Sequence, residues 1–270
     1  MQMPLRETAA ASRPTIGAAI ITRNEEQSLE RCLQSLSWVN EIVVVDDCST
    51  DRTVEIARSL GCRVVTRPLR SFAEQRTYAL SLLSTDWVLH LDADEECKPA
   101  LRDEILSVLG RTDRAGFTIP FRSRFLGKVM RCSDWSRHKG LRLGKRSLSS
   151  WKRAVHESLY IDGPVGHLHE QIEHHGDGNY AARVTKSNRY TSFEASLLAN
   201  QGVRFRIWRV LLIPLFRTFR SYFLNGGWRD GMIGLFWAGH VWWGNFAIYV
   251  KLWELERQGI STSTPPPRGS

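Results

Sequence analysis

Strand-like and helix-like segments alternate four times over the first hundred residues, and this alternation restricts the possible folds more than any other feature. Four short runs rich in β-branched and apolar residues have the character of buried strands: Ile16–Thr22, Glu41–Val45, Cys62–Thr66 and Trp87–Leu91. Apolar spacing and capping residues predict helices between and after them: Glu26–Leu36, Thr53–Leu60, Ser71 to about Leu83, and Pro99 to near Gly110. Such alternation predicts an α/β fold, with a mostly parallel sheet and helices on both of its faces.

Acidic residues follow two of the predicted strands. Asp46 and Asp47 end the second strand, and Asp92-Ala93-Asp94 ends the fourth. Because ligands of open parallel sheets bind beyond the carboxyl ends of the strands, we expect both acidic clusters to face one crevice. Two carboxylates this close repel each other unless a cation lies between them, so the second cluster is a candidate site for magnesium or manganese. The alternative for so short a motif is a solvated acidic loop.

Several segments, in this order, resemble the family-2 glycosyltransferases, which have the GT-A fold. The resemblance to the nucleotide-sugar-binding half of that family is carried by Ile20–Glu26, Val44–Asp51 and Leu91–Glu95. Other segments are similar to the bacterial branch that includes lipopolysaccharide core β-glucosyltransferases: Phe72–Arg76, Val155–Ser158 and Gly163–Gly166. The chain has no G-x-x-x-x-G-K-[ST] motif and no G-x-G-x-x-G after the first strand, which disfavours an ATPase or a dinucleotide enzyme.

The resemblance implies a metal-dependent, inverting transfer of a hexose, with glucose as the expected sugar, from a UDP-sugar. It implies that the donor is bound by the following side chains: Thr22, Asn24, Glu25, Asp46, Arg76 and Asp92. It further implies that Asp94, with Asp92, ligates Mn²⁺ or Mg²⁺, and that His174 closes over the donor phosphates or the metal. Arg76 would pair with the pyrophosphate, or else be an ordinary arginine on a helix surface. Asp47 departs from the branch, where a small residue is expected.

Inversion needs a base within hydrogen-bonding reach of the acceptor hydroxyl. Glu157 is our candidate, because the Val-His-Glu-Ser motif around it resembles the family. Asp134, the one acid in a basic stretch, is the alternative, and a structural ion pair is the other interpretation of Glu157. The cluster of histidines His167, His169, His174 and His175 suggests zinc, but its spacing matches no zinc motif.

Changes in composition divide the chain into parts. We predict a flexible N-terminus over residues 1–14 and a GT-A domain over 15–200, with a donor half at 15–110 and an acceptor half at 111–200. A basic, aromatic and helical region follows at 201–258, and then a disordered tail at 259–270, which is rich in Ser, Thr and Pro.

The region at 201–258 has the composition of a membrane-associating element. Phe205–Leu224 contains four arginines and no acid, and Gly231–Val250 contains no Asp, Glu, Lys or Arg. Glycines and tryptophans inside the second segment favour an interfacial position over a span. We therefore predict peripheral or monotopic attachment to the cytoplasmic side of the bacterial inner membrane. A soluble core or oligomer face, and a bilayer span, are the alternatives.

The chain is basic, with Lys and Arg exceeding Asp and Glu by 37 − 28 = 9, which indicates an anionic partner. We predict a membrane glycolipid acceptor, specifically the lipopolysaccharide inner core; polyprenyl phosphate is the alternative acceptor. The basic stretch Gly116–Arg153 would also suit a nucleic-acid-binding protein, but the paired carboxylates would repel phosphate, so we expect no nucleic-acid partner. A nucleotidyltransferase, which would release pyrophosphate, is the remaining alternative.

Overall fold

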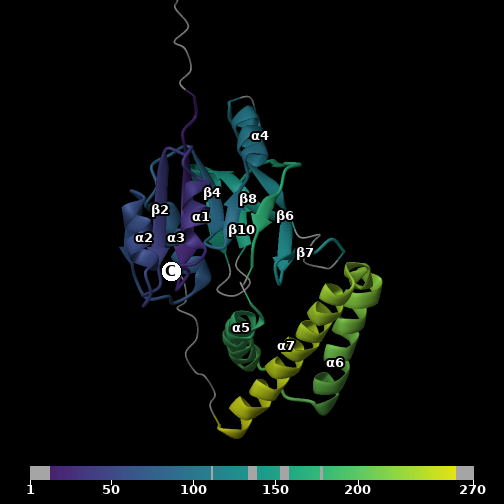
Figure 1. The fold of residues 1–270 in the computed structure, drawn as a ribbon. Coiled ribbons are helices and arrows are strands. Elements are labelled where there is room, and N and C mark those ends of the chain that lie inside the picture. Colours follow the sequence, from purple (N-terminus) through teal and green to yellow (C-terminus); the bar gives the residue numbers. More distant parts are fainter. Residues whose placement is uncertain (1–12, 111, 133–138, 153–157, 177–178, 260–270) are drawn as a thin grey trace, which may run out of the picture.

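A computed structural model of the chain describes residues 13–110, 112–132, 139–152, 158–176 and 179–259. It has an α/β body built on one sheet and a separate layer of long helices below it (Figure 1). The predicted N-terminal segment lies largely outside the described residues, and so does most of the predicted tail.

Four parallel strands form the first half of the sheet. They are β1 (Ile16–Thr22), β2 (Glu41–Asp46), β3 (Arg63–Thr66) and β4 (Trp87–Asp92), in the order β3-β2-β1-β4. Thr22 lies opposite Asp46, and Ile21 lies opposite Asp92. The carboxyl ends of β1, β2 and β4 therefore meet at one edge, as the alternation predicts.

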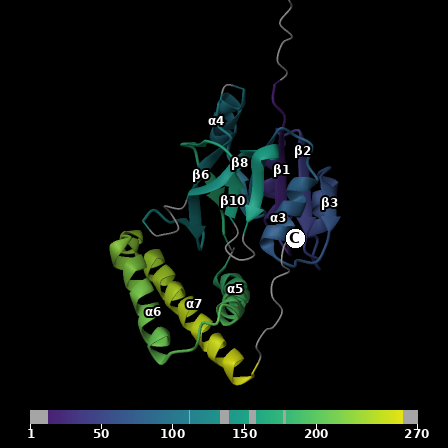
Figure 2. The same ribbon diagram turned by 180° about the vertical axis from the view of Figure 1, so that it is seen from behind.

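Helices cover both faces of this half, which confirms the predicted fold class (Figure 2). The helices are α1 (Leu29–Gln34), α2 (Thr53–Ser59), α3 (Phe72–Ser81) and α4 (Pro99–Leu109). Buried Ala18 and Ile20 pack on the side of α1, α2 and α4, whereas Ala19 and Val43 pack on the side of α3, because successive strand residues point to opposite faces. The Ser71 hydroxyl caps α3 by accepting a hydrogen bond from the backbone N–H of Glu74.

The second half of the sheet is mixed. Its strands are β5 (Glu95–Cys97), β6 (Gly116–Phe125), β7 (Lys128–Val129), β8 (Lys139–Lys145), β11 (Val165–His167) and β12 (Ile172–His174). β8 lies antiparallel between β4 and β6, pairing Leu143 with Leu89 and Phe117. A separate hairpin of β9 (Ser149–Lys152) and β10 (Ser158–Ile161) contacts β8 and α3. This arrangement brings chain segments from the predicted acceptor half to the edge where β4 ends.

The C-terminal layer consists of α5 (Tyr180–Asn200), α6 (Ile207–Phe219) and α7 (Met232–Arg257). A π-helical turn (Arg220–Leu224) and a 3-10 turn (Gly227–Asp230) join α6 to α7, which run side by side (Figures 1 and 2). Helix α5 lies within the predicted GT-A domain at 15–200, and it packs against α7, where the Lys251 ammonium donates to the Thr191 hydroxyl at 2.8 Å. Helix α5 is thus shared between the α/β body and the helical layer.

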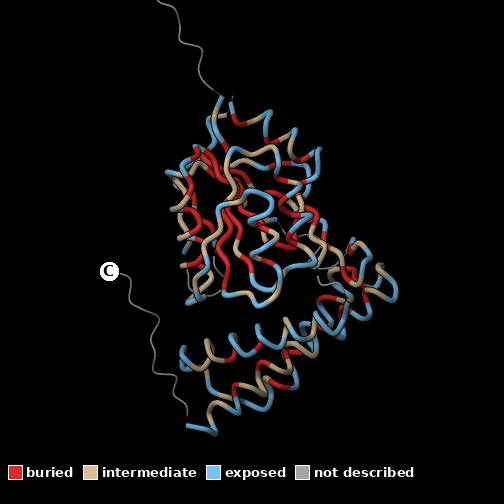
Figure 3. The backbone as a smooth tube through the Cα atoms, turned by 60° about the vertical axis from the view of Figure 1, so that its left-hand side comes forward, coloured by how far each residue is buried: buried red, intermediate tan, exposed pale blue. Residues whose placement is uncertain are grey.

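The helical layer is much more exposed than the body (Figure 3). Among the described residues, large exposed apolar side chains concentrate between Ile207 and Trp253. On α6 they recur at every fourth position and so lie along one side of the helix: Ile207, Leu211, Leu215 and Phe219. Within the part of the chain that the structure describes, no helix combines the length and the hydropathy needed to cross a bilayer.

The close approach of α7 to the turn before it yields a stability prediction. A Cβ atom at Gly234 would overlap the carbonyl oxygen of Gly227, and backbone atoms cannot move aside as a side chain can. We expect Gly234→Ala to lower the free energy of unfolding by about 1–3 kcal/mol. Gly244→Ala, on the same helix with open space around its Cβ position, is the matched control and is expected to be neutral or stabilising. Denaturant unfolding measures both, and equal stabilities would show that this contact is not tight.

Candidate active site

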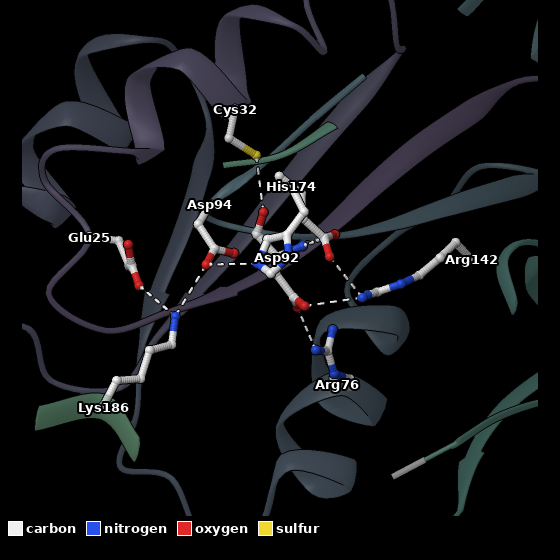
Figure 4. Close-up of polar contacts among 9 residues, drawn as sticks. Glu25, Cys32, Arg76, Asp92, Asp94, Arg142, His174 and Lys186 are labelled. Atoms are coloured by element: carbon white, nitrogen blue, oxygen red, sulfur yellow. Dashed lines mark hydrogen bonds and ion pairs between the residues drawn. The ribbon is translucent and has the colours of Figure 1, made fainter. Parts of the chain in front are cut away.

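Asp92, the last residue of β4, is held by two arginines from separate elements. One carboxylate oxygen accepts a hydrogen bond from Arg76 on α3, and the other accepts one from Arg142 on β8 at 3.1 Å (Figure 4). Burial alone would raise the pKa of Asp92, but the two guanidinium charges hold it well below its usual range. Arg142 also donates to Glu95 at 3.0 Å. Asp92 therefore forms ion pairs with two arginine side chains in this structure.

Asp94 lies two residues further and has different partners. Its Oδ2 lies 3.2 Å from His174 Nε2 on β12 and 3.2 Å from the Lys186 ammonium on α5. Burial opposes the charged carboxylate, yet the hydrogen bond from His174 and the charge of Lys186 keep its pKa low. Burial disfavours the charged imidazolium of His174. The hydrogen bond to Asp94 and the charge of that carboxylate outweigh the effect of burial, so the pKa of His174 is raised. Lys186 also lies 3.6 Å from Glu25, so it bridges the loop after β1 and the end of β4.

Asp92 and Asp94, the predicted metal ligands, face separate sets of basic side chains in this structure. Arg76 and Arg142 neutralise Asp92, and both of its oxygens accept from them, whereas Asp94 faces His174 and Lys186. Arg76 is buried under Asp92 and stacks over the Trp151 ring at 4.8 Å, so it is neither a helix-surface arginine nor aimed at open solvent. The like charges of Asp92 and Asp94 are relieved by two separate sets of cations.

The residues predicted to bind the nucleoside lie in two loops that are joined to each other. The Asn24 side chain accepts from the Thr50 N–H at 2.8 Å, and the Asn24 N–H donates to the Ser49 hydroxyl. The Asp46 carboxylate is fully buried and accepts from the N–H and the hydroxyl of Ser49. Asn24 and Asp46 thus fix the loop after β2 against the loop after β1. Thr22 is also buried, and within the described chain its hydroxyl has no hydrogen-bond partner.

Asp47, which stands where a small residue is expected, has partners in two neighbouring loops. It forms an ion pair with Arg23 at 2.7 Å and accepts from the Leu69 N–H at 2.8 Å. These two contacts join the loops that follow β1, β2 and β3. Asp47 therefore holds these three loops together at the carboxyl ends of the strands.

Three residues of the site have no role in the sequence analysis. Arg142 and Lys186 come from segments that follow β4 in the chain by 50 and more than 90 residues, and only the tertiary fold brings them to it. Glu95 is fully buried, and burial, opposed by Arg142, raises its pKa to about 7. The one available signal was the position of Glu95 directly after the D-x-D motif.

Both candidates for the base, Glu157 and Asp134, lie outside the described residues. The remaining histidines do not gather into a zinc site. His175 pairs with Glu96 at 2.7 Å, whereas His169 pairs with Glu104 at 3.1 Å. The two histidines thus have separate acidic partners. Across the described ranges, no group of three or more His, Cys, Asp and Glu side chains is placed to hold a metal ion.

Comparisons with known proteins agree with this geometry. The family model "Glycosyl transferase family 2" matches residues 18–155, which include the strand ends that carry Asp46, Asp92 and Asp94. The chain belongs to glycosyl transferase family 2. This glycosyltransferase is 30% identical to the lipopolysaccharide core biosynthesis glycosyltransferase LpsC of Rhizobium meliloti, over 81% of this chain and 84% of that protein. It is 32% identical to an uncharacterized glycosyltransferase of Rickettsia felis, over 82% and 86% of the two chains.

Solved structures with a similar arrangement include two bacterial proteins. Glucosyl-3-phosphoglycerate synthase from Mycobacterium tuberculosis, solved with Mn²⁺, UDP and phosphoglyceric acid, gives a TM-score of 0.47 at 19% identity, over 68% of this chain and 78% of that one. S. aureus TarS 1–349 gives 0.45 at 13% identity, over 91% and 92%. Both scores are below 0.5, so the superpositions are loose.

His90 lies beneath the site and yields a pH prediction. It is buried in β4 with its ring edge-on to Trp151 at 5.1 Å, and burial, aided by the charges of Arg76 and Arg142, lowers its pKa to about 3. Because an unfolded histidine titrates near 6.5, His90 takes up a proton on unfolding only below that pH. Its contribution to stability is therefore complete above about pH 6.5 and falls as the pH is lowered from there towards 3.

We expect this glycosyltransferase to lose about 2 kcal/mol of unfolding free energy between pH 6.5 and pH 5 through His90 alone. His90→Leu removes the titrating group at similar volume, so its stability should fall less over the same interval, whatever its stability at pH 7. Urea unfolding at pH 5, 6, 7 and 8 gives both profiles. Parallel profiles would mean that the pKa of His90 is the same in the folded and the unfolded protein.

Proposed function

We propose that this glycosyltransferase transfers a hexose, glucose, from a UDP-sugar to a membrane glycolipid of the lipopolysaccharide inner core, with inversion at the transferred carbon. The observation that carries the donor part is the position of buried Asp94, with His174 beside it, at the carboxyl end of β4 in a family-2 glycosyltransferase. The acceptor part is supported by the relation to LpsC and by the exposed apolar face of α6.

A divalent metal fits the chemistry of this site. Asp94 supplies a carboxylate kept ionised by its neighbours, and His174 supplies an imidazole, which leaves the remaining positions for diphosphate oxygens and water. Such a mixture of few protein ligands and substrate phosphates suits Mg²⁺ and Mn²⁺. When bound, the ion adds positive charge where negative charge develops on the departing nucleoside diphosphate.

The chain's own residues have distinct roles in this proposal. Lys186, which lies at Asp94 and Glu25, would add a positive charge beside the donor diphosphate. Arg76 and Arg142 keep Asp92 fixed and ionised, so that it can accept hydrogen bonds from the donor ribose. Glu157 takes the proton from the acceptor hydroxyl as that oxygen attacks the sugar, with Asp134 as the alternative base.

The test of the donor site uses Asp94→Asn, which keeps the shape and removes the charge. We expect the turnover of UDP-glucose to fall about a thousandfold or more, and Mn²⁺ binding, measured by electron paramagnetic resonance with UDP present, to be lost. Asp103→Asn, which changes an exposed carboxylate on α4, is the control and should match the wild type.

The assay measures released UDP and product with purified full-length protein, a panel of UDP-sugars and solubilised membrane glycolipid. Full activity in excess chelator would contradict the metal, and turnover of another UDP-sugar in preference to UDP-glucose would contradict the assigned sugar. Transfer to polyprenyl phosphate but not to the glycolipid would identify the alternative acceptor.

We also propose that the protein is attached, peripherally or monotopically, to the cytoplasmic face of the bacterial inner membrane through α6. Phe216 is 60% exposed on this helix, and Leu106, 51% exposed on α4, offers a matched control. Because burial of several such side chains contributes about 1.5–3 kcal/mol each, high salt should release little protein from vesicles. Phe216→Glu should weaken flotation with phosphatidylglycerol vesicles severalfold, and Leu106→Glu should not. If the wild-type protein does not float with the vesicles, the proposed attachment is refuted.

A further inference from the structure

An apolar cavity of about 1050 Å³ lies between α6, α7, the start of α5 and the turn between β6 and β7. Its size matches the upper end of the usual range for small-molecule sites, about 300–1,000 Å³. Side chains from all four elements form its walls, among them Leu126, Tyr180, Leu215, Phe219, Phe236 and Trp242. The cavity is therefore assembled by the packing of the helical layer against the α/β body.

The walls of this cavity are poorly protected from water. Leu215 is 58% exposed, Phe219 51% and Phe236 47%, although each lines the cavity. Contiguous apolar surface of this kind is uncommon on soluble proteins unless a ligand, a partner or a membrane covers it. The lining favours a ligand that is itself hydrocarbon.

The segment that contains α6 and the turns after it is rich in arginine. Six arginines and one acid, Asp230, lie between residues 204 and 230. Asp230 already accepts hydrogen bonds from the backbone N–H groups of Arg131 and Cys132. Arg217 and Arg220 are exposed within a turn of the cavity residues Leu215 and Phe219, and Arg217 keeps its charge while it donates a hydrogen bond to the Asn245 side-chain oxygen at 2.8 Å. An apolar cavity with a cationic rim is complementary to a lipid that carries an anionic head group.

The cavity is also close to the candidate active site. Ser123, which pairs with His174 across β6 and β12, is three residues before Leu126, or roughly 10 Å along an extended chain. Tyr180 is six residues before Lys186 on α5, or roughly 9 Å along the helix. A chain held in the cavity would leave its head group within reach of Asp94 and Lys186.

We propose that this cavity binds one hydrocarbon chain of the anionic lipid acceptor and so presents the acceptor's head group to the donor site. The identity of that lipid as the acceptor rests on the proposed function, whereas chain binding itself does not. The cavity then selects acceptors by their lipid part, and the sugar-binding crevice selects the donor.

Two glycines of α7 offer a matched test. Gly239 lines the cavity, and its Cβ position has nothing within 4 Å, so Gly239→Leu would project a side chain into the cavity without a clash. Gly244 is equally open on the same helix but does not line the cavity, so Gly244→Leu is the control. Both substitutions improve helix propensity alike, which leaves the filling of the cavity as the difference between them.

The probes are lysophosphatidylglycerols with 10, 12 and 14 acyl carbons, each below its critical micelle concentration, titrated into full-length protein by calorimetry. We expect one site per chain, an affinity that rises about tenfold for each two carbons added, and weaker binding of the zwitterionic lysophosphatidylcholines. Gly239→Leu should weaken binding at least tenfold, and Gly244→Leu should leave it within twofold. Binding of UDP should be the same in all three proteins.

Equal binding by wild type and Gly239→Leu, or no dependence on chain length, would overturn the proposal. Sedimentation that shows a dimer which binds no lysolipid would also overturn it, since a second copy would then cover the cavity. Lysophosphatidylcholine bound as tightly as lysophosphatidylglycerol would overturn the anionic head group. A wild-type protein that turns over UDP-sugar but binds no lysolipid chain refutes this inference alone, whereas a wild-type protein that binds the chain but turns over no UDP-sugar refutes the proposed function.

Discussion

The ion pairs of Asp92 with Arg76 and Arg142 are the interaction on which the rest of the site depends. They join the end of β4 to α3 on one side and to β8 on the other; the side chains of Arg76 and Arg142 are 8% and 13% exposed, and that of Asp92 is 33% exposed. The same two arginines lower the pKa of His90 beneath them and hold the Trp151 hairpin through the stacking of Arg76. The same two arginines therefore fix the position of the side chains around Asp92 and set the electrostatic potential there.

Asp94 has a different environment because its partners come from the part of the chain that leads into the helical layer. His174 ends β12, and Lys186 lies in the second turn of α5, so the charge of the Asp94 carboxylate is neutralised by groups from two later elements. Helix α5 meanwhile packs against α7 through Ser187 and Lys251. Helix α5 thus contacts both the candidate site, through Lys186, and helix α7 of the apolar layer.

The helical layer combines two kinds of surface that a soluble domain usually separates. Tryptophans stack with arginines, as Arg209 does over Trp208 and Arg229 over Trp228, at 5.4 and 5.1 Å. Side chains that are apolar in their body and charged at their tip are suited to the boundary between lipid tails and head groups. This composition is the basis for the proposed attachment of the layer to a membrane surface.

The sequence by itself determined the first half of this protein. The four parallel strands, the Ser71 cap and the meeting of Asp46 with the end of β4 follow from local periodicity and from the rule that parallel strands end at one edge, because those signals act over neighbouring residues. It also determined the family, through motifs that are contiguous in the chain. Only the tertiary structure decided the partners of the carboxylates. Arg142 reaches Asp92 because β8 inserts antiparallel beside β4, Lys186 reaches Asp94 because α5 crosses under the sheet, and the cavity exists because α6 and α7 pack against a distant turn. Contacts between residues that far apart depend on how whole elements pack, and no local pattern in the chain records that packing.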